Sequence, residues 1–146
     1  MTKTVLLVED NPGDVRIMRD ILIGSNDSIQ LIVASDGVEG MALLKREGAY
    51  VHASRPDLIL LDLNLPKMDG REVLELIKQD ENLRGIPVII LTTSDADSDV
   101  EKSYQLQASC YLKKPSDWES FASLVKTIMD FWLIKAKPPG MPTEAS

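Results

Sequence analysis

Apolar and polar residues follow one another along the chain in blocks of two kinds. Short and almost continuous apolar runs, bounded by turn residues, predict buried strands at residues 4–8, 29–34, 57–62, 88–91 and 108–112. Longer stretches repeat an apolar residue at every third or fourth position, which is typical of amphipathic helices. These stretches predict helices from 12 to about 24, with Asp14 off the apolar face, from 38 to about 48, and at 70–80, 100–107 and 118–134. The helix at 100–107 has only a weak apolar pattern, and residues 95–99 before it predict an acidic loop.

The strand-then-helix alternation occurs five times. It predicts an α/β fold, in which a doubly wound, five-stranded parallel sheet carries helices on both faces. Right-handed crossovers leave few topologies open to such a chain. We therefore expect residues 1–134 to form one domain, and the polar, Pro- and Gly-rich residues 135–146 to form a C-terminal tail.

Two helices carry recognisable start signals. Asn11 precedes Pro12, and this order predicts an asparagine cap with proline at the first helical position. Ser116 is followed three residues later by Glu119, which predicts a serine N-cap for the last helix.

Acidic residues stand at the ends of two predicted strands. Glu9 and Asp10 follow the first strand, and Asp62 ends the third. Open α/β sheets place their chemistry at the carboxyl ends of the strands, so three acids would meet in one cleft if these two strands are neighbours. Acids at strand ends can simply solvate loops, but their coincidence on two buried strands favours a site. Their mutual repulsion calls for a cation, and oxygen-only ligands suit Mg²⁺.

Three further residues add to this edge of the sheet. Thr92 closes the fourth strand with a hydroxyl, and Tyr111 lies in the fifth. Lys114 follows the fifth strand, where its ammonium could reach the acids, while Lys113 is expected to point elsewhere. A cis bond before Pro115 would aim Lys114 inward.

Composition narrows the possible partners. The formal net charge of −7 argues against a nucleic-acid backbone as the ligand. The single cysteine excludes an internal disulfide and favours a reducing compartment. The amino-terminal residues lack the features of a signal peptide, and no apolar run is long enough to span a membrane. We expect a cytoplasmic protein that binds neither nucleic acid nor membranes.

Together these residues resemble the receiver domain of two-component response regulators. The matching positions are Glu9, Asp10, Asp62, Thr92, Tyr111, Lys114 and Pro115. The resemblance implies a flavodoxin-like receiver fold with strand order 2-1-3-4-5. It also implies that Asp62 accepts a phosphoryl group from a sensor histidine kinase.

The same resemblance implies roles for the other positions. Asp10, Asp62 and the backbone carbonyl of Asn64 would bind Mg²⁺, and Glu9 would hold a water bound to the metal. Thr92 and Lys114 would contact the phosphoryl oxygens.

The resemblance further implies a switch. Thr92 and Tyr111 would move together and remodel the face formed by the fourth helix, fifth strand and fifth helix. Because no DNA-binding output segment is evident, the signal is expected to pass to a downstream protein or to a histidine phosphotransfer protein.

Some segments are similar to the stand-alone regulators that partner cyanobacterial phytochromes. They are residues 8–15, the loop before 55–57, residues 62–66, and the aromatic pair at 131–132 with Leu133. This narrower resemblance implies a phytochrome-type kinase as the phosphoryl donor. It also implies a homodimer through the face of the fourth helix, fifth strand and fifth helix.

Two other functions fit part of this pattern. A haloacid-dehalogenase-type phosphatase also uses a strand-end aspartate, but it needs a second aspartate two residues later, and here Asn64 stands there. A receiver-like interaction module that is never phosphorylated would not need the complete set of site residues. One departure from receivers is Thr93, which replaces the usual very small residue and is expected to narrow access to the acyl phosphate.

Overall fold

The fold is built on one parallel sheet. The computed structural model describes residues 3–24 and 29–135. The strands are β1 (Lys3–Val8), β2 (Ile29–Ala34), β3 (Leu58–Leu61), β4 (Val88–Thr92) and β5 (Cys110–Lys113). All neighbouring strands are parallel, and their order is β2-β1-β3-β4-β5, which confirms the predicted topology.

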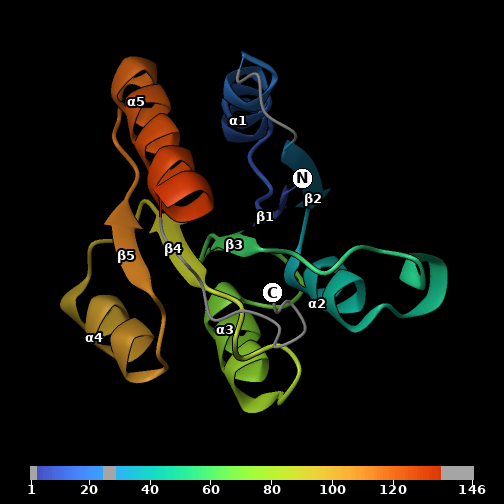
Figure 1. Cartoon of the computed structure of the whole chain (residues 1–146). Helices are drawn as coiled ribbons and strands as arrows, with labels where there is room; N and C mark the ends of the chain where they lie inside the picture. Colours follow the sequence, from blue (N-terminus) through green and yellow to red (C-terminus); the bar gives the residue numbers. More distant parts are fainter. Residues whose placement is uncertain (1–2, 25–28, 136–146) are drawn as a thin grey trace.

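Helices cover both faces of the sheet. They are α1 (Pro12–Gly24), α2 (Gly37–Lys45), α3 (Gly70–Gln79), α4 (Asp97–Gln105) and α5 (Trp118–Met129). Figure 1 shows α1 and α5 on one side of the sheet, with α2, α3 and α4 on the other. A short 3-10 turn, η1 (Gly48–Tyr50), follows α2, and a π-helical segment, η2 (Asp130–Lys135), extends α5.

The central strands β1, β3 and β4 are apolar over most of their length because each face of the sheet is buried. Leu6 and Val8 of β1 pack into the cluster under α2 and α3. Val5 and Leu7 of the same strand pack into the cluster under α1 and α5. Alternate side chains point to opposite faces, so a strand covered on both sides reads as a continuous apolar run.

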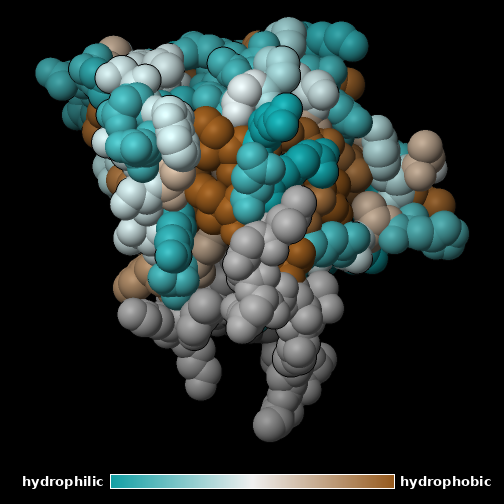
Figure 2. Space-filling model, turned by 90° about the horizontal axis from the view of Figure 1, so that it is seen from above, coloured by the Kyte–Doolittle hydropathy of each residue, from teal (hydrophilic) through white to brown (hydrophobic). Residues whose placement is uncertain are grey.

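The outer surface of the α1 and α5 side is mostly hydrophilic. Figure 2 views the molecule from this side and shows apolar side chains near the middle of the face, with polar and charged ones around them.

Among residues 3–24 and 29–135, none of the helices has both the length and the apolar character needed to cross a membrane.

Several predicted boundaries are wrong by a few residues. Helix α4 begins at Asp97 instead of residue 100, because the acidic residues expected to form a loop make its first turn. Negative side chains there are favourable at the positive end of the helix dipole. Strand β5 spans Cys110–Lys113 instead of 108–112, and α5 ends at Met129 before the π-helical segment. Of the predicted tail, residues 136–146 lie outside the described part of the chain.

One of the two predicted caps is correct. The Asn11 side chain accepts hydrogen bonds from the amides of Gly13 at 2.9 Å and Asp14 at 3.1 Å. The cap predicted at Ser116 is wrong, since Asp117 caps α5 by accepting a bond from the Ser120 amide at 2.9 Å. Asp117 stands immediately before the first helical residue, where its carboxylate reaches that amide.

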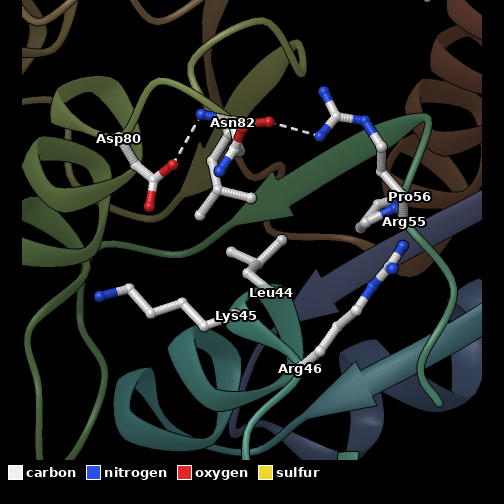
Figure 3. A pocket seen from close by; sticks show the side chains of 8 residues that line it. Leu44, Lys45, Arg46, Arg55, Pro56, Asp80 and Asn82 are labelled. Carbon is white, nitrogen blue, oxygen red and sulfur yellow. Dashed lines mark hydrogen bonds between the residues drawn. The ribbon is translucent and has the colours of Figure 1, made fainter. Parts of the chain in front are cut away.

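Hydrogen bonds hold the long connection that leads into β3. They lie near the amino-terminal end of this strand, opposite the end that carries the acids. The Arg55 guanidinium donates to the Asn82 carbonyl, and the Asp80 carboxylate accepts from the Asn82 amide at 2.7 Å (Figure 3). These residues line a hollow of 410 Å³ together with the end of α2. The contact joins the segment that leads into β3 to the loop that follows α3.

Candidate functional site

The three predicted acids meet at the carboxyl edge of the sheet. Val8 of β1 lies in register with Leu61 of β3, so the residues that follow both strands emerge side by side. Carboxylate oxygens of Glu9, Asp10 and Asp62 all lie within 4.8 Å of one another. Glu9 and Asp62 are buried, whereas Asp10 is exposed at the mouth of the site.

The backbone after β3 is held tightly around Asp62. The Asp62 amide donates to the Val8 carbonyl at 3.1 Å, and the Asn64 amide donates to Oδ1 of Asp62 at 3.1 Å. Gly70 begins α3 directly against this turn, where a Cβ atom would lie 2.1 Å from the Asp62 carbonyl oxygen. Only glycine permits this approach. The loop therefore folds back over the strand end, while Oδ2 of Asp62 accepts a hydrogen bond from the Lys114 ammonium at 3.2 Å.

Lys114 supplies the positive charge at the centre of the site. Its Nζ lies 2.6 Å from Glu9, 2.8 Å from Asp14 and 3.2 Å from Asp62. The lysine side chain is 6% exposed, so its charge-assisted contacts with Glu9 and Asp62 are buried, and the contact with Asp14 is partly buried. The prediction that Lys114 reaches the acids is confirmed. The suggested cis bond before Pro115 is wrong, because the described chain contains no cis peptide and the lysine points inward without one.

Asp14 is a site residue that the sequence analysis missed. It lies in the first turn of α1, four residues after Asp10, and it was assigned to the polar face of that helix. Its carboxylate binds Lys114, which is distant in sequence. The usable signal is the spacing from Asp10, because a residue in the first turn of a helix that starts at the site can face back toward it.

Burial and charge shift the pKa values of this cluster. Burial raises the pKa of Glu9 to about 7, with repulsion from Asp62 adding to it and the ammonium of Lys114 opposing it. For Lys114, burial acts to lower the pKa, but hydrogen bonds to Asp14 and Glu9 raise it overall. Lys114 therefore remains charged, and the excess of carboxylates leaves room for a further cation.

The shifted pKa of Glu9 makes stability depend on pH. The folded protein holds this proton up to about pH 7, whereas the ordinary pKa is 4.5. The stability that Glu9 contributes is thus fully present below about pH 4.5 and is lost as the pH rises through about 7. In metal-free buffer, we expect wild type to lose up to about 3 kcal/mol relative to Glu9→Gln between these limits. Urea unfolding across the range measures this difference, and parallel curves for the two proteins would contradict it.

The donor set of the site fits Mg²⁺. Asp10 and Asp62 offer hard carboxylate oxygens, Glu9 lies beside them, and the exposure of Asp10 leaves one side open. Mg²⁺ is commonly bound by one or two carboxylates together with waters and phosphate oxygens. Added MgCl₂ is accordingly expected to raise the unfolding free energy of wild type most above pH 7, where Glu9 is ionised.

Thr92 and Tyr111 lie along the next two strands. Thr92 ends β4 and is fully buried, and its Oγ1 accepts a long bond of 3.5 Å from the Ser94 amide. The Tyr111 hydroxyl donates to the Ser94 carbonyl at 2.8 Å, so this half-buried ring points toward the β4–α4 loop. Lys113 turns outward to the exposed Asp95 at 3.0 Å, as predicted.

A second network, also missed from the sequence, borders the site. The Arg71 guanidinium of α3 pairs with Asp99 of α4 and with Asp69, and Asp99 also accepts a bond from the Ser94 hydroxyl at 2.6 Å. The bonds from Arg71 and Ser94 lower the pKa of Asp99 to about 2. No sequence signal links residues 71 and 99, which are 28 positions apart.

Known proteins match the chain over nearly its full length. The sequence profile of the response regulator receiver domain matches residues 5–126. Response regulator Rcp1 of a Synechocystis species is 47% identical over 131 residues, which cover 90% of this chain and 89% of Rcp1. The residues matched by the receiver domain profile include the three acids and Lys114.

Solved structures agree with this similarity. The phosphorylated cyanobacterial phytochrome response regulator RcpA superposes with a TM-score of 0.93 at 46% identity, covering 96% of this chain and 100% of RcpA. The Mn²⁺-bound form of Rcp1 superposes with a TM-score of 0.91 at 46% identity, covering 94% and 99% of the two chains.

Proposed function

The chain belongs to the response regulator receiver domain family, and on that basis we propose that Asp62 accepts a phosphoryl group from a sensor histidine kinase. The observation that carries this proposal is the position of Asp62. It is a buried carboxylate at a strand end, within 3.2 Å of the Lys114 ammonium and close to Glu9 and Asp10.

The arrangement supplies what phosphoryl transfer requires. A carboxylate oxygen of Asp62 attacks phosphorus in line with the histidine nitrogen of the donor, the P–N bond breaks, and its electron pair returns to the imidazole. Lys114 provides fixed positive charge for the equatorial oxygens, and the Thr92 hydroxyl can donate to one of them. The Lys114 ammonium is already positioned by the acids, so little reorganisation is needed.

The acids of the site have a second role. Asp10, Asp62 and the Asn64 carbonyl would hold Mg²⁺, with Glu9 behind them, and the ion would neutralise charge on the phosphoryl group. The Mn²⁺-bound form of Rcp1 supports divalent-cation binding here. The part of Asn64 is a prediction from the family resemblance.

A phytochrome-type kinase is the proposed donor, because the similar regulator RcpA is a phytochrome response regulator. We expect a phytochrome histidine kinase, labelled on its histidine, to transfer the label to wild type within minutes when Mg²⁺ is present. An unrelated histidine kinase serves as the control. The proposal is contradicted if no label moves from any kinase or from acetyl phosphate, the result expected of a phosphorylation-independent module. The cytoplasmic location of this protein remains a prediction.

Thr93 is proposed to protect the acyl phosphate. It follows the fully buried Thr92 and is itself exposed at the rim of the site. Thr93→Ala should open a path for water, so we expect the half-life of the phosphorylated protein to shorten several-fold. Timed loss of label from the two proteins measures this, and equal half-lives would remove the role of Thr93.

The α4–β5–α5 face is proposed to carry a homodimer and the downstream partner. Exposed aromatic side chains support this: Trp118 is 66% exposed at the start of α5, and Tyr104 of α4 is 49% exposed. Phe131 of η2 is 52% exposed and stacks edge-on against Trp132. Light scattering of the isolated chain should report a dimer, and a monomer at high micromolar concentration would contradict the assignment.

A further inference from the structure

Arg71 ties three separate segments together beside the site. Its Nε and Nη2 each lie 2.8 Å from one oxygen of Asp99, which makes a two-pronged pair between α3 and α4. Its Nη1 lies 2.9 Å from Asp69, the residue that caps α3, and 3.4 Å from the Leu63 carbonyl. One side chain therefore joins the loop that follows Asp62 to the first turn of α4.

Asp99 extends this connection to Tyr111. Oδ2 of Asp99 accepts the Ser94 hydroxyl at 2.6 Å, and the Ser94 carbonyl accepts the Tyr111 hydroxyl at 2.8 Å. Ser94 is thus held on its side-chain oxygen by Asp99 while its carbonyl faces the tyrosine. A continuous series of bonds runs from Arg71 through Asp99 and Ser94 to Tyr111.

This series has the features of a rigid support. A guanidinium that meets both oxygens of a carboxylate fixes orientation as well as distance, which a lysine cannot do. The Asp99 side chain is only 16% exposed, so solvent competes weakly for it. Helix α4 has no side-chain cap at Ala96, and the nearby ion pair of Lys113 with Asp95 is exposed to solvent.

We propose that Arg71 is a positioning residue that keeps Tyr111 in its inward position, in which the tyrosine hydroxyl donates to the Ser94 carbonyl. Arg71 does so by holding the β4–α4 loop through Asp99 and Ser94. In the outward position this bond is broken. This inference rests on the proposed function, because it assigns to Arg71 control over Tyr111, which the family resemblance implies moves together with Thr92 on phosphorylation of Asp62. Arg71 does not contact the phosphoryl group. Arg71 sets the ratio of inward to outward positions of the Tyr111 ring.

The test is fluorine NMR of the full chain with 3-fluorotyrosine at its three tyrosines. Tyr111→Phe identifies the resonance of Tyr111. In Arg71→Gln we expect the ratio of inward to outward Tyr111 to fall by about tenfold, the effect of losing a partly buried charge-assisted pair. Arg71→Lys, which keeps the charge but loses the two-pronged geometry, should give an intermediate fall.

Two further variants separate positioning from general effects. Lys102→Gln is the matched control, because it removes the same charge from an exposed side chain of α4 and should leave the Tyr111 resonance unchanged. Ser94→Ala leaves the Arg71–Asp99 pair in place but breaks the series, so it should reproduce the shift seen in Arg71→Gln. If Arg71→Gln does not fold, Arg71→Lys decides the matter, because it changes the same side chain and keeps its charge.

Labelling of Asp62 by acetyl phosphate is measured in the same samples. Arg71→Gln should still take up label, while its Tyr111 resonance reports a larger population of the outward ring position. If Tyr111 responds to Arg71→Gln and Ser94→Ala no more than to Lys102→Gln, the positioning role is wrong even though labelling succeeds. If wild type takes up no label, the proposed function fails, while the Tyr111 signals still show whether Arg71 positions the ring.

Discussion

Replacing Asp62 by asparagine is expected to abolish phosphoryl uptake from acetyl phosphate and from any kinase. The amide cannot act as the nucleophile, and the other carboxylates of the cluster do not replace it. Glu9 is buried against the Lys114 ammonium at 2.6 Å, and Asp10 is exposed at the mouth of the site. The variant should fold, because the Asn64 amide can still donate to the side-chain oxygen at position 62.

The control for this prediction is Asp20→Asn, which removes an exposed carboxylate from α1. It should keep the uptake of wild type. Labelled phosphoryl groups retained by the protein after gel filtration give the measurement. Uptake by Asp62→Asn at the wild-type level would show that another residue is the acceptor.

Replacing Lys114 by methionine is expected to have the largest effect on stability. The lysine is the only cation within 4 Å of Glu9 or Asp62 among the described residues, and all three side chains are nearly inaccessible. Removing one partner of a buried ionic cluster leaves uncompensated charge and typically costs about 3–5 kcal/mol. We expect a loss of this size in metal-free buffer, and a partial recovery when MgCl₂ replaces the missing charge.

The same substitution should slow phosphoryl uptake. Losing one fixed charge that stabilises a transition state typically costs about 100-fold in rate. Lys113→Met is the matched control, since its pair with Asp95 is 57% and 72% exposed and should contribute almost nothing to stability or rate. Urea unfolding and acetyl phosphate kinetics measure both effects. A Lys114→Met protein as stable and as fast as Lys113→Met would contradict the assigned role.

The strands and the acid cluster could be predicted because they follow from simple rules. A sheet buried on both faces needs continuous apolar strands, and the carboxyl ends of neighbouring parallel strands bring Glu9, Asp10 and Asp62 together. Lys114 was found through its place after the last strand. These positions depend on the strand order, which the family resemblance implied, whereas the alternation of strands and helices predicts only a parallel sheet covered on both faces.

Other features depend on side-chain geometry that no periodicity encodes. Asp14 was placed off the apolar face of α1 and given no role, yet its carboxylate contacts Lys114 from the first turn of that helix. The pairing of Arg71 with Asp99 requires the relative placement of α3 and α4, which only the packed structure supplies. The weak apolar pattern of α4 also gave no signal for its first turn. Asp99 was therefore predicted to lie in a loop, although it belongs to that turn.

The most direct test of the account identifies the residue that carries the phosphoryl group. Wild type is incubated with acetyl phosphate and Mg²⁺, reduced with borohydride, which converts an aspartyl phosphate to homoserine, and digested for tandem mass spectrometry. We expect homoserine at position 62, dependent on both acetyl phosphate and Mg²⁺. Homoserine at Asp10 or elsewhere, or none under conditions that label another receiver domain in parallel, would contradict it.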